Sequence, residues 1–307
     1  MKYVAYKMAF QTGVHFGIGM LHETRNRFLA DTLYSALCIE ALKQGEDCLE
    51  RLYQLSKDGK LLFSDSFPYI KETLYIPKPI MSVECGNHSI VDRKKWKKLK
   101  YLPINQVEEY FSGKLDIDLE TMKLKELGYA QVRQMVSLSN SEKSEPYSVG
   151  VYYFKKGNGL YFIMGYEEET DREFVEPLII SLGYQGIGGK VSVGLGKYRV
   201  VPLELEENVK KRFEQSKGSF ILLTTSLPNE SEIENAMEKA TYSIEKRSGF
   251  IQSSAYAEEL VKKREMFFLQ AGSVLKERFS GDIYNVGRKG THPIWRYGKP
   301  IFMEVSN

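Results

Sequence analysis

Residues 186–197 read GIGGKVSVGLGK and lie between a predicted helix (171–183) and a predicted strand in YRVVPLEL (198–205). With the helix first, this order is the reverse of the order around nucleotide-binding loops. The segment lacks a Walker A motif, and Val191 stands where GxGxxG needs its third glycine. Two interpretations stay open: backbone N–H groups and lysines that bind phosphate oxygens, or a tight loop that packs against its neighbours.

The chain before this loop predicts a βαββαβ order over residues 1–205, which is the ferredoxin-like or RRM-like arrangement. Asp31 is the expected N-cap of the first helix, and Gly45 is expected to kink or split it. Residues 147–154 and 159–166 flank Lys155–Asn158 and predict a hairpin. The elements are strand 2–10, helix 30–57, strand 61–69, and strands 147–154 and 159–166, before helix 171–183.

Residues 75–130 interrupt this order, with two prolines first, then a basic run, then a stretch rich in Glu, Lys and Asp. After residue 205 a second set of strand-like and helical segments begins. We expect an α+β protein with two ferredoxin-like (RRM-like) βαββαβ lobes, a glycine-rich loop and an inserted thumb-like segment. The expected domains are 1–205, with the insert at about 75–130, and 206–307.

Composition excludes several classes of protein. Of 307 residues, 42% are hydrophobic and 27% are charged, which is typical of a globular chain and not of a disordered or fibrous one. No apolar run reaches the roughly 18 residues that a membrane span needs, and the N-terminus lacks a signal peptide pattern. The three cysteines, Cys38, Cys48 and Cys85, form no CxxC pair. We therefore expect a cytoplasmic protein without a disulfide framework, metal site or cofactor.

The net charge is only +3, but basic residues are clustered. Residues 93–100 read RKKWKKLK, and residues 286–299 carry four basic residues with Trp295 and Tyr297. Cations between aromatic residues suit single-stranded nucleic acid, and they suit solvated or packed segments equally well.

His15, flanked by Gly13 and Gly17, could be a general base, an RNA contact or an ordinary loop residue. Asp31 is better explained as a helix cap than as a catalytic group. The sequence contains no HExxH, GxSxG or Cys–His signature, so no catalytic residue is assigned.

Short motifs along the whole chain resemble the RAMP superfamily of CRISPR proteins. Within it, the chain is similar to the subunit of type III-A (Csm) effector complexes that binds the guide handle; DTLYSAL, SDSFPY and PKP carry that finer resemblance. The matching segments are VHFGIG (14–19), DTLYSAL (31–37), LLFSDSFPY (61–69), YIPKP (75–79), GLYFIM (159–164), GIGGKVSVGLGK (186–197), KRSGFIQS (246–253), AGSV (271–274) and HPIWRYG (292–298).

The resemblance implies an antiviral, non-catalytic RNA-binding subunit. It would cap the repeat-derived 5′ handle of the guide RNA and dock the large polymerase/nuclease subunit to the RAMP backbone subunit, meeting target RNA only indirectly and no membrane. The alternative is a RAMP-type metal-independent endoribonuclease that processes guide precursors, with His15 as acid or base.

The resemblance also implies the RNA-contacting residues. The glycine loop would cradle handle phosphates, His15 and its neighbours Gly17 and Arg25 would face the same groove, and Arg133 would add a basic contact. The loop residues are Gly188, Gly189, Lys190, Ser192, Gly194, Gly196 and Lys197.

Overall fold

The computed structural model describes residues 1–81, 90–137, 145–251, 256, 259, 261–288 and 290–305. Cys85 and Lys289 lie outside these residues, as does part of the motif at 246–253. Cys38 and Cys48 are free.

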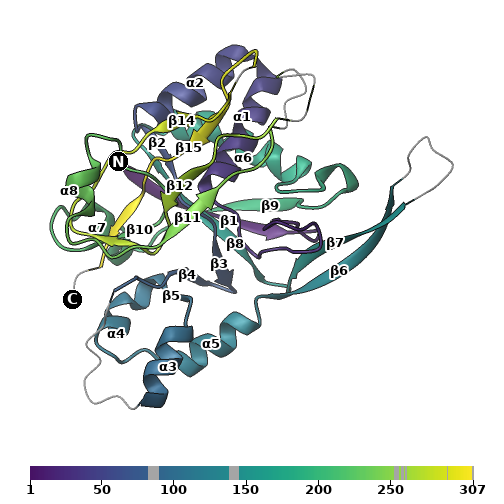
Figure 1. Ribbon diagram of the computed structural model, residues 1–307. Helices are drawn as coiled ribbons and strands as arrows, with labels where there is room; N and C mark the ends of the chain where they lie inside the picture. The colour runs from purple at the N-terminus through teal and green to yellow at the C-terminus, as the bar shows by residue number, and fades with distance from the viewer. Residues whose placement is uncertain are drawn as a thin grey trace.

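A seven-stranded antiparallel sheet occupies the centre of the molecule (Figure 1). Its strands run in the order β5-β4-β3-β8-β1-β9, with β2 also paired to β8, and every pair is antiparallel. Within it, β9-β1-β8-β3 is the strand order that a βαββαβ unit gives. The strands are β1 (Lys2–Phe10), β2 (Leu61–Phe63), β3 (Phe67–Ile70), β4 (Thr73–Pro77), β5 (Tyr101–Pro103), β8 (Asn158–Tyr166) and β9 (Tyr198–Glu204).

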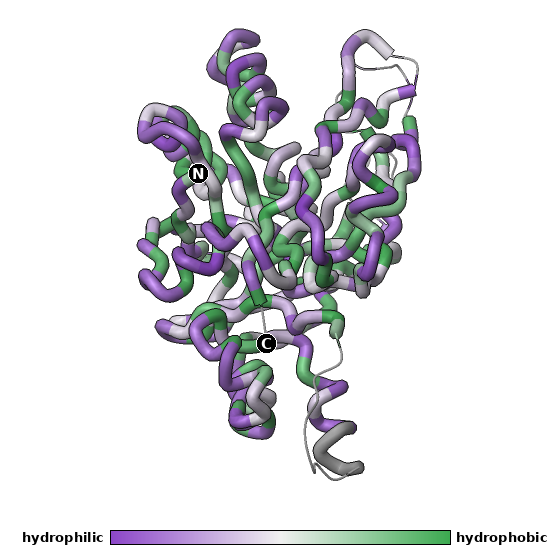
Figure 2. The backbone as a smooth tube through the Cα atoms, turned by 90° about the vertical axis from the view of Figure 1, so that its left-hand side faces the viewer, coloured by the Kyte–Doolittle hydropathy of each residue, from purple (hydrophilic) through white to green (hydrophobic). Residues whose placement is uncertain are grey.

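Both faces of this sheet are buried, which explains the unbroken apolar run of β8. On one face Tyr6 and Phe162 pack under the helices α1 (Ala30–Gln44), α2 (Glu46–Lys57) and α6 (Glu169–Gln185). On the other face Ala5 and Tyr161 pack against the insert and the C-terminal half. Hydrophobic segments accordingly run through the middle of the tube in Figure 2.

The first helix is split at Gly45, as expected, because Gly45 adopts φ +134°, which favours glycine. The expected capping role of Asp31 is wrong. Asp31 lies inside the first turn of α1, and the Ala30 N–H instead donates to Asp65 Oδ1 at 2.9 Å. Asp65 follows β2, so the cap comes from a residue that only the fold brings to the helix start.

The hairpin expected between residues 147–154 and 159–166 is also wrong. Both segments are strands, but β7 (Glu145–Phe154) pairs along its length with β6 (Gly128–Ser137), not with β8. The reason is burial: β8 is buried at every position and belongs in the central sheet, whereas β7, which precedes it, is only partly buried and pairs outside that sheet. The pair β6–β7 forms a long hairpin that projects from the body (Figure 1).

The segment expected as the insert, 75–130, begins inside the sheet, because β4 runs to Pro77. Apart from β5, its described remainder folds into a small helical unit at one end of the molecule (Figure 1). The helices are α3 (Ile90–Lys98), η1 (Ile104–Gln106), α4 (Val107–Phe111) and α5 (Ile117–Lys125). The projecting hairpin starts only at Gly128, so it lies almost wholly after the predicted boundaries.

The described residues of the C-terminal half form one three-stranded sheet, β13-β10-β16, and two two-stranded sheets, β11-β12 and β14-β15. A second ferredoxin-like lobe and a boundary at residue 205 remain proposals. The elements of this half are α7 (Glu207–Glu214), β10 (Phe220–Leu222), α8 (Ile233–Met237), β11 (Ile244–Arg247), β12 (Met266–Leu269), β13 (Val274–Leu275), β14 (Ile283–Asn285), β15 (Trp295–Tyr297) and β16 (Phe302–Glu304). The short helix η2 (Val191–Val193) lies earlier, in the glycine loop.

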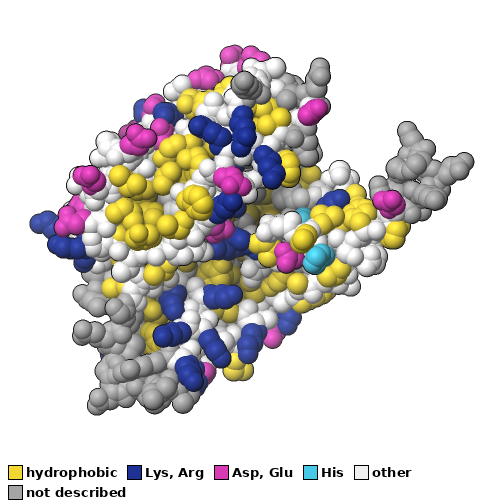
Figure 3. Space-filling model, viewed as in Figure 1, with side chains coloured by type: hydrophobic (Ala, Val, Ile, Leu, Met, Phe, Trp, Pro, Cys, Tyr) yellow, Lys and Arg dark blue, Asp and Glu magenta, His cyan; other side chains and the backbone are white. Residues whose placement is uncertain are grey.

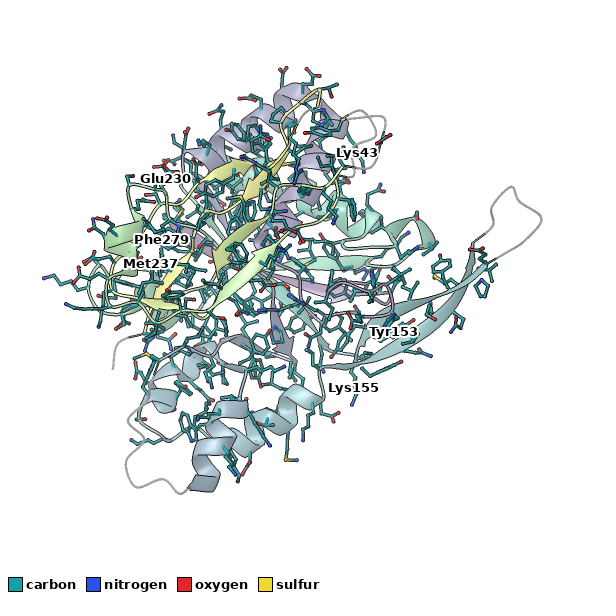
Figure 4. All side chains as sticks on the ribbon, in the orientation of Figure 1. Lys43, Tyr153, Lys155, Glu230, Met237 and Phe279 are labelled. Atoms are coloured by element: carbon teal, nitrogen blue, oxygen red, sulfur yellow. The ribbon has the colours of Figure 1, made fainter. Side chains whose placement is uncertain are left out.

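The two halves share cores. Tyr297 of β15 packs at 5.1 Å from Tyr34 of α1, and its hydroxyl accepts from the Phe63 N–H at 2.9 Å. A smaller cluster around Phe279, with Met237 against it, belongs to the C-terminal half alone (Figure 4).

Candidate nucleic-acid interface

Three segments meet along the β6–β7 hairpin, between the pairs Gly128–Phe154 and Met135–Tyr147: the glycine loop 186–197, the loop 11–28, and β7 itself. We call this stretch the hairpin base. The Gly189 N–H donates to His15 O at 2.8 Å. Val14 and Tyr152 exchange both backbone hydrogen bonds at 2.8 Å. These bonds hold the glycine loop and the hairpin on opposite sides of one short segment, residues 13–16.

The glycines of the loop are needed for backbone packing. Gly196 has φ +81°, and a Cβ there would lie 2.2 Å from Ile187 O. Gly188 has φ +101°, and a Cβ there would lie 2.7 Å from His15 O. A side chain at either position would clash with backbone. This supports the tight-loop interpretation for these two glycines and leaves the loop's exposed residues to meet a ligand.

Cationic side chains surround this junction without acidic partners. Lys190 Nζ lies 4.5 Å over the Tyr147 ring and 3.4 Å from its hydroxyl. The exposed Arg133 lies 5.4 Å over the ring of Tyr153. Lys197 and Arg199 are exposed. Within the described residues, none of these four cations forms an ion pair, so their charge is available to a ligand.

An aromatic stack lies beside these cations. Tyr129 of β6 stacks on Tyr153 of β7 with ring centroids 5.5 Å apart, and Tyr129 is 56% exposed. Figure 4 shows Tyr153 and Lys155 together near the start of the projecting hairpin. Cations for phosphates and an exposed ring for a base are the two chemical requirements of a single-stranded nucleic acid site.

His15 serves the fold at this junction. It is only 7% exposed, and its Nδ1 lies 2.7 Å from Gly150 O. Because a carbonyl oxygen only accepts, Nδ1 carries the hydrogen. The ring therefore bonds loop 11–28 to β7 and has little access to a ligand. Of the other residues expected here, Gly17 and Ser192 are exposed and Gly194 is half-buried.

Arg25 is the one expected contact that lies in an ion pair, with Nη1 2.5 Å from Glu245 Oε1. Glu245 belongs to β11, so this pair joins the two halves of the chain. We call the surrounding set of ion pairs the lobe seam; it consists of Arg25, Arg27, Asp31, Glu245, Arg247 and Arg296.

Asp31 is the centre of the seam. Arg247 donates to both of its oxygens, at 3.0 and 2.9 Å, and Arg296 lies at 3.9 Å. Burial alone would raise the pKa of Asp31, but Arg247 and then Arg296 bring it below its usual value. The carboxylate therefore stays ionised as a structural link between α1 and β11.

Asp65 is a second link across the halves that the sequence did not reveal. It accepts from Ala30 N and from Thr225, whose Oγ1 donates at 2.6 Å and whose N–H donates at 3.1 Å. Burial raises the pKa of Asp65 to about 6, although these hydrogen bonds act in the opposite direction. In the sequence, the only indication of this role is that the Ser-Asp-Ser segment at 64–66 directly follows a buried strand.

The two basic runs singled out from the sequence differ. In the first, Trp96 packs 4.9 Å from Tyr110 inside the insert, whereas most of the described lysines are exposed. In the second, Arg296 and Lys299 are buried, and Trp295 stacks on Tyr53 at 4.5 Å. Figure 3 shows that Lys and Arg side chains nevertheless gather over the insert and beside the hairpin.

Comparison with known proteins decides the family. Residues 215–305 match the family model for the CRISPR Csm4 C-terminal domain. The chain is 33% identical over 292 residues to the CRISPR system Cms protein Csm4 of Mycobacterium tuberculosis (strain CDC 1551 / Oshkosh), covering 95% of this chain and 94% of the relative. This chain belongs to the Csm4 family. It is also 30% identical over 321 residues to the Csm4 protein of Streptococcus thermophilus, covering 99% of each.

Solved structures share the fold. A chain of the Csm3–Csm4 subcomplex of the type III-A CRISPR-Cas interference complex matches with a TM-score of 0.68 at 21% identity, covering 99% of each chain. A chain of the Csm1–Csm4 cassette with AMPPNP matches with a TM-score of 0.61 at 18% identity, covering 100% of this chain and 98% of that one. The resemblance to Csm-type RAMP proteins is thereby confirmed.

In the described part of the chain, no group of three His, Cys, Asp or Glu side chains lies close enough together to hold a metal ion. None of its helices is both long and apolar enough to span a membrane.

Proposed function

We propose that this chain is the non-catalytic RNA-binding subunit of a type III-A CRISPR effector complex. It holds the repeat-derived 5′ handle of the guide RNA and docks the large polymerase/nuclease subunit to the RAMP backbone subunit. Its relatives were crystallised with Csm3 in one complex and with Csm1 in another, and membership of their family supports both docking roles.

The observation that carries the RNA role is the group of cations at the hairpin base. Lys190, Arg133, Lys197 and Arg199 face no carboxylate among the described residues, whereas Arg25 and Arg247 nearby are ion-paired. Unneutralised cations beside an exposed aromatic stack favour a ligand with phosphates and bases. We place the handle along this surface, with the hairpin acting as a thumb beside it.

The burial of His15 supports a role without turnover. A general base must reach the 2′-hydroxyl whose proton it removes, and His15 is 7% exposed with one nitrogen bonded to Gly150 O. Its geometry suits a structural hydrogen bond better than proton transfer. No observation here favours the endoribonuclease alternative.

The test is purification of the tagged chain from its native host, with sequencing of the bound RNA and identification of co-purifying proteins. We expect RNAs that share one 5′ end of repeat-derived nucleotides, together with a large multidomain subunit and a repeated RAMP subunit. RNA cut at one internal repeat site without those partners would overturn the proposal.

Charge reversal then tests the surface itself. The double variant Lys190→Glu/Lys197→Glu should lose RNA and keep its protein partners. In binding assays, loss of two phosphate contacts should reduce the salt slope by about 1.4, from about 0.7 per contact for single strands. The matched control is Lys211→Glu/Lys217→Glu, two exposed lysines around the end of α7, across the molecule from the hairpin (Figure 1). Equal RNA occupancy in both double variants would indicate a protein adaptor instead.

A further inference from the structure

A pocket of about 330 Å³ lies between loop 18–24 and the base of the β6–β7 hairpin. Its lining includes Ile18, His22, Glu23, Val132 and Gly150. The volume is at the lower end of the range for small-ligand pockets, which suits a single flat ring system. In Figure 3, histidine and acidic side chains lie among hydrophobic ones beside the base of the hairpin.

The walls of this pocket are held in place by Gly150. Its N–H donates to Leu21 O at 3.0 Å, and its carbonyl accepts from His15 Nδ1 at 2.7 Å. A Cβ at Gly150 would lie 2.3 Å from His22 O, so only glycine allows the loop to approach β7 this closely. A preformed pocket spares a ligand the entropy of ordering its walls.

The far end of the loop is fixed as well. The Arg25 N–H donates to Phe16 O at 2.8 Å, and the Phe16 N–H donates to Thr24 Oγ1 at 3.1 Å. The backbone carbonyl of His15, the residue before Phe16, accepts from the Gly189 N–H of the glycine loop. The pocket and the cationic surface of the glycine loop are therefore attached to the same short segment.

The lining combines apolar walls with one carboxylate. Ile18 is 46% exposed and Val132 is 54% exposed, so both can pack on the faces of a ring. Glu23 Oε2 accepts from the Met20 N–H at 3.3 Å, and Glu23 forms no ion pair with any described residue. A carboxylate repels phosphate but accepts hydrogen bonds from an amino group. Its position suits the edge of a base rather than the RNA backbone.

We propose that this pocket receives one unpaired RNA base and selects bases that carry an amino group over uracil. Adenine, cytosine and guanine can each donate an amino hydrogen to Glu23, whereas uracil has no amino group, and its single N3–H donor is flanked by two carbonyl oxygens, which the carboxylate repels. The inference rests on the proposed RNA-binding function and adds base selectivity to it.

The experiment measures the affinity of the full-length chain for short single-stranded RNAs at one fixed salt concentration. The RNAs are oligouridylates in which a single uridine is replaced, position by position, by adenosine, cytidine or guanosine. At one position we expect each replacement to raise affinity about tenfold, from about 1–3 kcal/mol per well-made base contact. Equal affinity for all the RNAs would overturn the inference and leave the proposed function standing.

Variants locate the selectivity. Glu23→Ala should bring the affinity ratio between RNAs with one amino-bearing base and the plain oligouridylate close to one. Val132→Trp should do the same by filling the pocket. The control is Glu230→Ala on the opposite side of the molecule (Figure 4), which should shift all affinities equally. A ratio that survives Glu23→Ala and Val132→Trp would overturn the pocket assignment. If no RNA binds the unchanged protein, the proposed function and this inference fail together.

Discussion

At the lobe seam Asp31 faces Arg247 and Glu245 faces Arg25, whereas at the hairpin base Lys190 and Arg133 lie over tyrosine rings and form no ion pair with a described residue. The two regions lie at opposite ends of loop 11–28; the seam cations are all arginines, and those at the hairpin base are lysines and arginines. In the seam each charge is paired with another from a distant part of the chain. At the hairpin base the cations remain available to a ligand. The lack of ion pairs with described residues, more than the local density of Lys and Arg, therefore distinguishes the candidate interface.

Removing the centre of the seam should have the largest effect on stability. Asp31→Ala leaves the partly buried Arg247 and the buried Arg296 without their carboxylate, and we expect a loss of about 3–5 kcal/mol in the free energy of unfolding. Urea titration followed by circular dichroism measures it. At temperatures where the variant is folded, its RNA affinity should equal that of the unchanged protein. A stable variant with weakened RNA binding would contradict the division into two regions.

The pH dependence of Asp65 gives the next largest effect. Its pKa of about 6 lies above the value of 3.8 for an unburied aspartate, so the folded state binds more protons between these values. The contribution of Asp65 to stability is therefore greatest below about pH 4 and falls as the pH rises through about 6, by up to about 3 kcal/mol.

Asp65→Asn removes this titration. The difference in unfolding free energy between Asp65→Asn and the unchanged protein should consequently change between pH 4 and pH 7, in favour of the variant at the upper end. Urea unfolding at four pH values measures the difference. A difference that stays constant over this range would show that folding does not raise the pKa of Asp65.

Arg133 tests the other region with a smaller effect. Arg133→Ala should weaken binding of single-stranded RNA by about fivefold and lower the salt slope by about 0.7, because one phosphate contact is lost. Its side chain is exposed, so the free energy of unfolding should change by less than about 0.5 kcal/mol. Fluorescence anisotropy at several salt concentrations supplies both numbers. An unchanged salt slope would remove Arg133 from the interface.

The smallest effect is expected at an ion pair outside both regions. Lys60 and Glu167 lie 3.6 Å apart and are about half exposed, at 50% and 51%. Glu167→Ala should change the free energy of unfolding by less than about 1 kcal/mol, because water screens exposed pairs. The same urea titration checks this. A loss as large as that of Asp31→Ala would mean that burial does not make the ion pairs of the seam more important for stability than exposed ones.

Much of the candidate site could be located from the sequence, but the roles within it could not. The glycine loop, the loop around His15 and Arg133 do converge at the hairpin base or next to it. Arg25 was expected to face RNA, and its pairing with Glu245 spans 220 residues of chain. No local pattern predicts a partner at that separation, because the contact depends on how two sheets pack.

Local patterns were enough to predict the main strands and helices of the βαββαβ unit in residues 1–205, the break at Gly45, and, through short motifs, the family. These properties follow from local hydrophobic periodicity, backbone freedom and residue identity. Three features depend on tertiary contacts instead: the pairing of β7 with β6, the capping of α1 by Asp65 rather than Asp31, and, among the described residues, which cations lack an acidic partner. Strand pairing and burial of charge depend on contacts between distant segments, and a linear pattern contains no information on which of several compatible partners packs closest.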